Sequence, residues 1–304
     1  MAKHPTTLEQ FRSFCFQNKT TDFEQAVEYF AVFGGMGWKV DMSKPLDVLI
    51  REKVLENYRY IHGDIAKITQ SDRTHHALLS GLAMGDSREH SAFKRANVSR
   101  EEGEESIDFL VHNDLLIREK SQAQPVNERE EVSEKLRFTL PFLRFWFSSI
   151  SPYYKGIRDG DYSEVMKRLE NMKDEFSKPI YDQLVMEAVK VSFKEDKIEK
   201  IGSYWDKNNE IDLLAKTKSG KIVAGTFKYA KSKAKKSELT RLKEQCDKAA
   251  LEADTFVLFS KNGFSNEIKK EKGEQLKLLT LKNLKLLVAD LSENDLLINT
   301  NKKY

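Results

Sequence analysis

The chain has 304 residues, a formal net charge of +3 and an apolar content of 39%. This length suggests two domains with sizeable cores, and the longest apolar run is far shorter than the roughly 18 residues of a membrane span. Without a signal peptide, and with only Cys15 and Cys246 as cysteines, the sequence predicts a soluble protein of the reducing cytoplasm. We expect both thiols to be buried and no membrane partner.

Charge is distributed unevenly along the chain. Residues 100–114 carry one base and six acids, a net charge of −5. Residues 216–248 carry eleven bases and three acids, a net charge of +8. A local excess of one sign says more about binding partners than the total does. The basic stretch therefore raises the hypothesis of an anionic partner such as DNA.

The first residues of the chain read as helices. Residues 5–33 repeat apolar side chains at intervals of three and four, with Thr21 or Asp22 as the N-cap of a second helix. A phosphate-binding loop needs a preceding strand and a lysine or helix start behind it, and neither is clear for the glycine-rich residues 34–45, so we interpret them as a turn. A second pair of helices is expected up to about residue 68.

Residues 74–140 have the outline of a winged helix-turn-helix. Two short helices precede a third, which begins with Ser99 and Glu102 at the spacing of a capping box. Residues 115–121 and 135–141 then read as two strands around a polar loop. The third helix of such a module often contacts DNA, but here it is acidic, so we expect a protein-contact module.

Residues 142–154 are rich in aromatic side chains. One interpretation is stacking on single-stranded bases with Arg144 nearby. The other, which we favour, is that they pack the joint between two domains. We accordingly predict a helical and winged-helix domain over residues 1–150 and an α/β domain over residues 151–304.

The C-terminal half alternates between helical and strand patterns. A helix is expected over residues 161–193, and mixed strands with helices between them predict an α/β layer structure. The expected strands are residues 210–217, 221–229, 254–260 and 276–281, with helices at 237–252 and 263–271.

The first two of these strands would form a hairpin that gathers polar residues. Period-two alternation places Thr226 and Lys228 on one face of their strand. If residues 218–220 form the turn, Asp212 lies opposite Thr226. A two-residue turn would instead direct Asp212 to the other face.

An aspartate that faces an x-x-Lys triplet is typical of metal-dependent nucleases. Carboxylates hold the metal, the metal activates a water, and the lysine orients that water or stabilises the developing charge. In the triplet Thr226-Phe227-Lys228 a hydroxyl stands where a carboxylate is usual, so Mg²⁺ is expected to bind weakly. Acids that could complete the site, or be solvated surface charges, are Asp182, Glu210 and Glu244. Glu187, five residues after Asp182 on the same helix, faces elsewhere.

A run of cations follows the second strand directly. Two interpretations stay open for it: a solvated loop, or contacts with nucleic-acid phosphates. Our hypothesis assigns phosphate contacts to Lys231, Lys233, Lys235, Lys236 and Arg241.

Several segments, taken in order, resemble the C-terminal half of a large group of prokaryotic ATPases. They are YDQLVMEAVKVSF, IGSYWDKNNEIDLLA, IVAGTFKYA and FVLFSKNGFS. That half is catalogued as domain of unknown function 234, and the resemblance spans about residues 60–290. It implies a winged helix followed by a degenerate PD-(D/E)XK nuclease fold. By this resemblance Asp182 and Asp212 would be metal ligands and Lys228 the base or charge stabiliser. Glu210 is a further candidate ligand because it shares the strand face of Asp212, two residues away.

The chain departs from that family in two places. The usual Glu-Cys-Lys triplet is Thr226-Phe227-Lys228, which predicts weak or absent cleavage. No G-x-x-x-x-G-K-[ST] loop occurs, so we expect no ATP hydrolysis, and any ATPase would be a separate partner. The leading hypothesis is a DNA-binding protein with a degenerate restriction-endonuclease-like domain. The alternatives are an active Mg²⁺-dependent deoxyribonuclease, a winged-helix regulator, and a structural partner of an ATPase.

Overall fold

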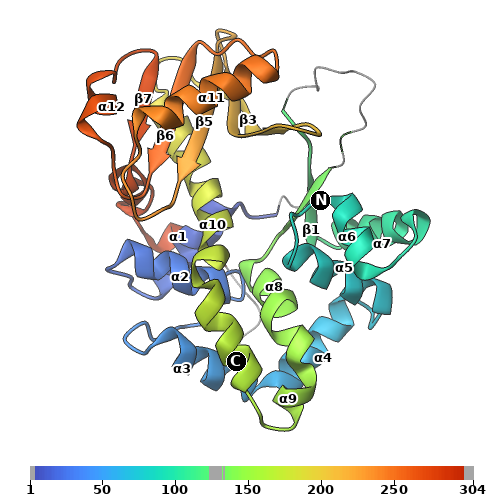
Figure 1. Ribbon diagram of the computed structural model, residues 1–304. Helices are drawn as coiled ribbons and strands as arrows, with labels where there is room; N and C mark the ends of the chain where they lie inside the picture. Colours follow the sequence, from blue (N-terminus) through green and yellow to red (C-terminus); the bar gives the residue numbers. More distant parts are fainter. Residues whose placement is uncertain (1–3, 123–131, 133, 298–304) are drawn as a thin grey trace. The chain divides into compact units, whose positions relative to one another are not determined.

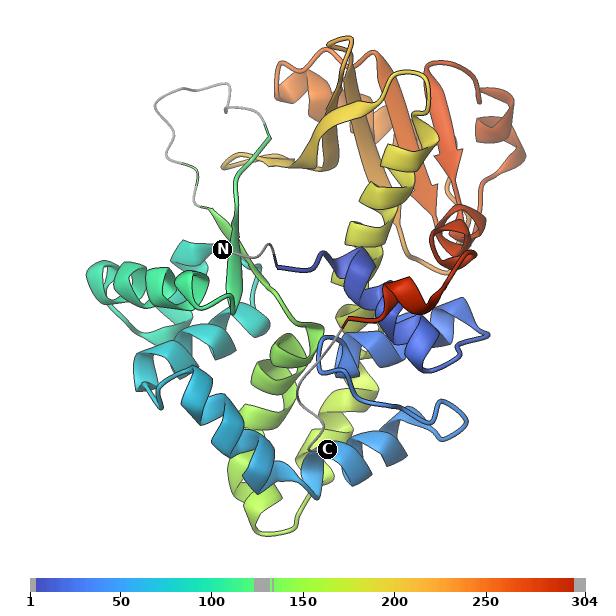
Figure 2. The ribbon, with the colours of Figure 1, turned by 180° about the vertical axis from the view of Figure 1, so that it is seen from behind.

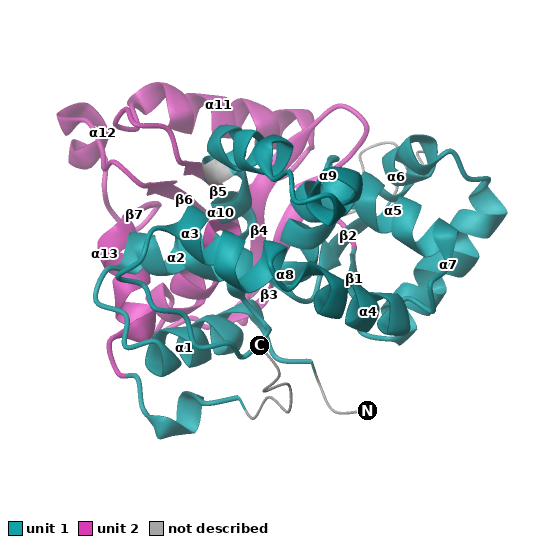
Figure 3. Cartoon of the chain, turned by 90° about the horizontal axis from the view of Figure 1, so that it is seen from below, with its two compact units in different colours: residues 1–119, 133–180, 291–304 teal, residues 120–132, 181–290 magenta. Residues whose placement is uncertain are grey.

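The computed structural model describes residues 4–122, 132 and 134–297, and the chain divides into two compact units (Figure 3). Unit 1 comprises residues 1–119, 133–180 and 291–304, and unit 2 comprises residues 120–132 and 181–290. The division differs from the expected boundary at residue 150, because it falls after Ile180, inside a long helix. Helical periodicity continues across such a boundary, so the sequence pattern does not mark it.

Unit 1 is mainly helical (Figure 1). Its first part contains α1 (Thr7–Gln17), α2 (Phe23–Phe33), α3 (Leu46–Ile50), the π-helical η1 (Arg51–Leu55) and α4 (Tyr58–Ile68). Next come α5 (Arg73–Ala83), α6 (Glu89–Ala96), α7 (Arg100–His112), β1 (Leu116–Glu119) and β2 (Lys135–Phe138). The remaining elements are α8 (Pro141–Phe145), η2 (Trp146–Ile150), η3 (Ser151–Tyr153), α9 (Tyr154–Arg158), the start of α10 (Ser163–Ser192) and η5 (Glu293–Asp295).

Helix starts in unit 1 follow the capping signals of the sequence. The Asp22 carboxylate accepts the backbone N–H of Gln25 at the start of α2, so Asp22 is the N-cap and Thr21 is not. Ser99 and Glu102 form the expected capping box of α7. A side-chain oxygen at the N-cap satisfies a backbone donor that has no partner within the helix.

Helices α5, α6 and α7 are followed by a two-stranded antiparallel ribbon, in the predicted order. In the ribbon Leu116 pairs with Phe138 and Glu119 with Lys135. Most of the polar loop expected between the strands lies outside the described residues.

The aromatic residues 142–150 form part of the core of unit 1. Phe142, Phe145, Trp146 and Phe147 are all buried, and Trp146 stacks on Tyr58 with ring centroids 5.5 Å apart. Buried rings cannot stack on nucleic-acid bases, so that interpretation is wrong for these four rings, whereas Tyr154 at the end of the segment is exposed. The segment also lies well before the boundary at Ile180, so it does not mark a joint between domains.

Helix α10 contains a proline, Pro179, in its interior. Proline has no N–H and leaves the carbonyl four residues earlier, that of Glu175, without its helical partner. The Arg144 guanidinium donates to this carbonyl at 3.3 Å. A side chain from α8 thus compensates for the hydrogen bond that the proline removes.

Unit 2 contains a mixed five-stranded sheet in the order β3-β4-β5-β6-β7. Strands β3, β4 and β5 are antiparallel, whereas β5, β6 and β7 are parallel. A helical N-terminal region and an α/β C-terminal part therefore match the coarse fold prediction. The strands are β3 (Ile198–Trp205), β4 (Glu210–Thr217), β5 (Ile222–Lys228), β6 (Thr255–Ser260) and β7 (Leu276–Leu279). The helices that follow α10 are α11 (Lys236–Lys248), α12 (Asn266–Lys270), α13 (Leu281–Lys285) and η4 (Leu286–Val288).

Strand β3 was not predicted from the sequence. It is an edge strand of the sheet, where exposed charges such as Glu199 and Lys200 are tolerated and discourage further pairing. These charges, together with Gly202, remove the apolar alternation by which strands are recognised.

Helices cover the two faces of the sheet. Helix α11 lies on one face in Figure 1, and the C-terminal turns of α10 lie on the other face in Figure 2. On the α11 side, Leu239 and Leu242 join a buried cluster with Leu214, Ala224 and Leu258 from three neighbouring strands. This packing positions the polar residues at the ends of β4 and β5. No helix in the described ranges is long and apolar enough to cross a membrane.

Candidate functional site

The hairpin β4–β5 has the register that brings Asp212 and Thr226 together. Leu213 pairs with Gly225 and Leu214 with Ala224. Continuing this register by one step places Asp212 opposite Thr226, as predicted for a turn at residues 218–220. Gly220 supports that turn with a φ of +93°, a conformation that glycine adopts without strain.

Asp212 lies in a β-bulge. On the other side of β4, Gly202 pairs with Leu214 and Tyr204 pairs with Ile211, so two residues of β4 oppose the single residue Ser203. Ser203 donates its hydroxyl to the backbone carbonyl of Asp212 at 3.0 Å. A bulge bends its strand and redirects a side chain, which is why bulges often occur next to functional sites.

The Asp212 carboxylate receives two hydrogen bonds on one oxygen. Thr226 donates through Oγ1 to Oδ2 at 2.8 Å, and the backbone N–H of Phe227 donates to the same atom at 2.9 Å. The Asp212 carboxylate therefore accepts a backbone hydrogen bond from β5 at the end of the β4–β5 pairing. Thr226, the first residue of the x-x-Lys triplet, donates a hydrogen bond to Asp212. A carboxylate at residue 226 would instead repel the negative charge of Asp212.

Lys228 is paired with Glu238, an acid that was not predicted from the sequence to lie at the site. Its Nζ lies 2.7 Å from Oε1 of Glu238, and both side chains are largely buried, with exposed fractions of 21% and 16%. Arg241 contacts the other oxygen of Glu238 at 2.8 Å. Glu238 lies in the first turn of α11, where a negative charge interacts favourably with the helix dipole. This position is a sequence signal by which Glu238 could have been predicted.

Asp182 from α10 accepts a hydrogen bond from the hydroxyl of Tyr229 at 2.5 Å. Burial raises the pKa of Tyr229 well above its ordinary value, and the negative charges of Asp182 and Asp212 raise it further. The tyrosine hydroxyl thus stays protonated and acts as a donor. The ammonium group of Lys261 lies 5.2 Å from the centre of the neighbouring Tyr181 ring.

The other predicted acids have different surroundings. Glu210 is exposed at the start of β4, and its backbone carbonyl accepts from Gln245 at 2.9 Å. Glu187 pairs with Lys190 at 2.7 Å, and Glu244 is exposed on α11.

The family resemblance implies Mg²⁺ between Asp182 and Asp212. Among the described residues, no three His, Cys, Asp or Glu side chains gather where they could hold a metal ion. Mg²⁺ needs near-octahedral oxygen coordination. Here Asp212 and Asp182 accept hydrogen bonds from Thr226, Phe227 and Tyr229 instead. This arrangement of side chains does not fit a magnesium site.

The predicted phosphate-binding cations fall into two groups. Lys236 pairs with Glu271 at 2.7 Å, and Arg241 pairs with Glu238. Lys231, Lys233 and Lys235 are exposed, and no acid of the described chain lies within ion-pair distance of them.

The backbone that carries these three lysines is anchored. Ala234 is buried; its N–H donates to the carbonyl of Gly263 and its carbonyl accepts from Ser265, both at 2.9 Å. Asn262 also donates its side-chain amide to the carbonyl of Ala230 at 2.9 Å. The lysines therefore project from a segment tied to the loop after β6, which favours a defined cationic surface over a freely solvated loop.

Comparison with known proteins identifies one matching region. Neither the curated proteins nor the solved structures included a match to the chain. Residues 146–240, from η2 into α11, match domain of unknown function 234, a family described as archaea bacterial proteins of unknown function.

Proposed function

We propose that unit 2 is a degenerate PD-(D/E)XK-type domain that binds nucleic acid through phosphate contacts and does not cleave it. The proposal is supported by the order of its elements: a helix with Asp182, a hairpin with Asp212 and Lys228, then α11 and a parallel strand. We also propose that α5–α7 and the β1–β2 ribbon form a winged helix.

One observation carries the binding proposal. Lys231, Lys233 and Lys235 are exposed and have no acid within ion-pair distance in the described chain, on a backbone tied to residues 262–265. Cations that are not neutralised within the protein release counterions when they contact phosphates, and this release drives non-specific binding. Anchoring of the backbone reduces the entropy lost when the lysines engage a phosphate chain.

The polar residues of the hairpin argue against cleavage. Asp212 accepts from Thr226 and Phe227, and Lys228 is neutralised by Glu238. A lysine in an ion pair is poorly placed to stabilise charge that develops on a phosphate. The same residues instead stabilise the end of the hairpin next to the lysine segment.

We propose that the winged-helix element contacts another protein. A separate ATPase is a suitable partner, because this sequence contains no G-x-x-x-x-G-K-[ST] loop. Helix α7 exposes Glu101, Glu105 and Asp108 to solvent, and Arg100 pairs with Glu104. Acids at the surface of the third helix would repel the DNA backbone. Contact with nucleic acid is therefore assigned to unit 2.

The binding proposal is tested by measuring the affinity of the full chain for labelled DNA at several salt concentrations. Replacing Lys231, Lys233 and Lys235 together with alanine should weaken binding and reduce the slope of log K against log [salt] by roughly 2 to 3. The matched control replaces Lys216, Lys218 and Lys221, three exposed lysines around the β4–β5 turn. Equal losses in both variants, or no binding by the wild type, would reject the proposal.

Cleavage is tested separately with supercoiled plasmid and labelled single strands in Mg²⁺ or Mn²⁺. Wild type and Asp212→Ala are compared, and neither is expected to cut. Cutting that disappears in Asp212→Ala would replace this proposal with the alternative, an active nuclease. Cutting that persists in the variant would indicate a contaminant.

A further inference from the structure

The backbone of the lysine segment, residues 231–235, is held in two different ways. Lys233 and Lys235 flank Ala234, which is buried in the core of unit 2 and forms a parallel bridge with Phe264. Neighbouring residues of an extended segment point to opposite sides, so both lysines project away from the core. The packing of Ala234 therefore fixes the backbone of these two cations.

Lys231 lies outside this bridge. The chain bends at residues 230–232, shortly after β5 ends at Lys228. At the bend, the side chain of Asn262 donates through Nδ2 to the carbonyl of Ala230 at 2.9 Å. A carbonyl cannot donate, so the nitrogen of the amide must face it. Asn262 thus connects the bend that carries Lys231 to the loop after β6.

The loop after β6 holds Asn262 in a defined place. The backbone N–H of Lys261 donates to the carbonyl of Lys228 at 3.0 Å, and the carbonyl of Gly263 accepts the N–H of Ala234 at 2.9 Å. Gly263 has a φ of +75°, a conformation that glycine adopts without strain. The backbone on both sides of Asn262 is therefore bonded to the chain that leads from β5 to α11.

The amide of Asn262 orders a surface segment and is not part of the core. Asn262 is exposed, and a hydrogen bond at the surface contributes modestly to the free energy of unfolding. Fixing the backbone of a flexible residue costs conformational entropy. If the backbone of Lys231 is already fixed in the free protein, phosphate binding does not have to overcome that cost. Asn262 can therefore strengthen binding without contact with the ligand.

We propose that Asn262 is a positioning residue for phosphate binding by unit 2, and that it acts through Lys231. This inference rests on the proposed function, in which the lysine segment contacts nucleic-acid phosphates. The Asn262 amide holds the bend at Ala230, and the bend keeps the backbone of Lys231 in place before the ligand arrives. Lys231 then engages a phosphate together with Lys233 and Lys235.

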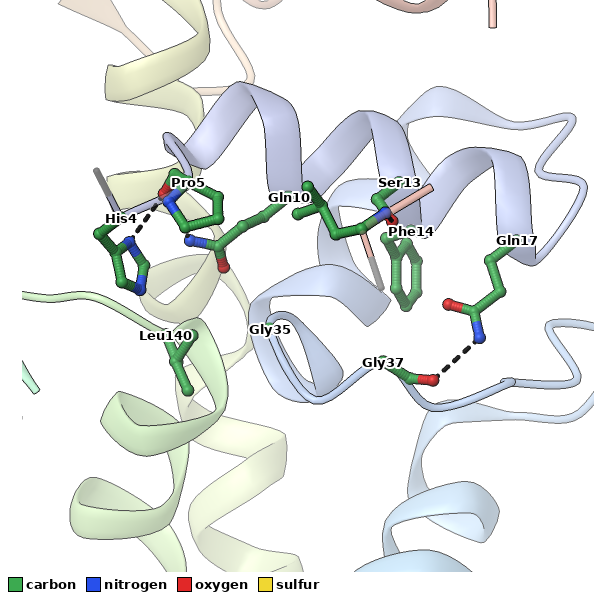
Figure 4. Close-up of a pocket in the computed structure, with 10 residues that line it drawn as sticks. His4, Pro5, Gln10, Ser13, Phe14, Gln17, Gly35, Gly37 and Leu140 are labelled. Atoms are coloured by element: carbon green, nitrogen blue, oxygen red, sulfur yellow. Dashed lines mark hydrogen bonds between the residues drawn. The ribbon is translucent and has the colours of Figure 1, made fainter. Parts of the chain in front are cut away.

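Unit 1 offers a matched control for the loss of this bond. Gln17 of α1 donates its side-chain amide to the carbonyl of Gly37 at 2.9 Å, beside a pocket that lies along the helix (Figure 4). The bond has the same length and the same type of donor and acceptor as that of Asn262, and it is likewise exposed. Gln17→Ala therefore removes an equivalent hydrogen bond from the unit that does not contain the lysine segment.

The first test measures the affinity of the full chain for a labelled DNA duplex of mixed sequence. Asn262→Ala should weaken binding at least about fivefold, because Lys231 must then be ordered when it binds. The slope of log K against log [salt] should stay unchanged, since no cation has been removed. Gln17→Ala should bind like the wild type. Unchanged affinity of Asn262→Ala, or an equal loss in both variants, would overturn the proposal.

A double-mutant cycle tests whether Asn262 acts through Lys231. In a Lys231→Ala background, Asn262→Ala should have little further effect on DNA affinity, because the cation that it positions is gone. In a Lys235→Ala background it should keep its full effect, because Ala234 anchors residue 235 independently. The same loss of affinity in both backgrounds would show that Asn262 does not act through Lys231, and the proposal would fail.

A measurement without DNA separates this inference from the proposed function. NMR relaxation of the free protein should give the backbone amide of Lys231 an order parameter near that of a rigid backbone, about 0.85, and Asn262→Ala should lower it below about 0.6. The amide of Lys235 should not change. An unchanged value at Lys231 would contradict positioning even if DNA binds. Loss of order in the variant, with no DNA binding by the wild type, would instead reject the proposed function and with it the role of Asn262 in binding.

Discussion

Thr226 donates its hydroxyl to Oδ2 of Asp212 at 2.8 Å. The aspartate also accepts the backbone N–H of Phe227. The two side chains thus form a hydrogen-bond acceptor and its donor. Asp212 then contributes to the stability of the hairpin without any ion.

Thr226→Val should lower the free energy of unfolding by about 1–2 kcal/mol, because the variant keeps the shape of the side chain but removes a donor to a partly buried carboxylate. The measurement is urea denaturation. Thr240→Val is the control, since Thr240 is exposed on α11 and donates to a carbonyl at 3.4 Å. Equal effects of the two changes would contradict a special role for the Asp212 bond.

Thr226→Glu should make thermal stability depend on divalent cations. A second carboxylate beside Asp212 creates a like-charge pair that a cation can bridge. We expect Mg²⁺ or Mn²⁺ to raise the Tm of Thr226→Glu but not that of the wild type. Thr226→Gln controls for size, and a similar cation effect in this uncharged variant would refute the explanation.

The Lys228–Glu238 pair should show strong coupling in a double-mutant cycle. Lys228→Met or Glu238→Gln leaves a largely buried charge without its partner, and each should cost about 1–3 kcal/mol. The double variant should cost less than the sum, because no unpaired charge remains. Urea denaturation of the four proteins measures the coupling energy, and additive effects would show that the two side chains act independently.

His76 should make unit 1 less stable in mild acid. Burial lowers the pKa of His76 below its ordinary value of 6.5, and the neighbouring His62 and His75 lower it further, with Asp72 opposing them. Because the unfolded chain binds the proton first, the free energy of unfolding falls as pH drops below about 6.5, until the folded-state pKa is passed.

The control is His76→Gln, which keeps a hydrogen-bonding group near the Thr69 hydroxyl, now 2.6 Å from His76 Nε2, but does not titrate. Between about pH 7.5 and pH 5.5 the wild type should lose more stability than this variant. Parallel pH profiles of the two proteins would mean that other groups cause the acid sensitivity.

Cys15 and Cys246 should react slowly with alkylating reagents in the folded protein. Both are buried, and desolvation raises the pKa of each thiol to about 11. The reactive thiolate is then scarce near neutral pH, so alkylation should be roughly a hundredfold slower than in urea. Mass spectrometry of each cysteine checks this, and rapid labelling of either native thiol would contradict its burial.

Local features of the chain were predictable because their causes are local. Asp22 begins α2, and Ser99 with Glu102 forms the capping box of α7, because a cap depends on residues within one helical turn. The pairing of Leu213 with Gly225 likewise follows from the length of one short turn. The sequence therefore determined most helices and strands, whereas it allowed the meeting of Asp212 with Thr226 without deciding between a two-residue and a three-residue turn.

Contacts between distant elements could not be read from the sequence. The ion pair of Lys228 with Glu238 depends on how α11 packs on the sheet, and the hydrogen bond from Tyr229 to Asp182 depends on α10 on its other face. The bulge at Asp212 requires β3, an edge strand whose charges hide its pattern. Periodicity indicates which face of an element is apolar. Only tertiary packing decides which element covers that face. Packing also decides which buried polar atoms have no hydrogen-bond partner among the described residues, such as Oε1 of Gln10.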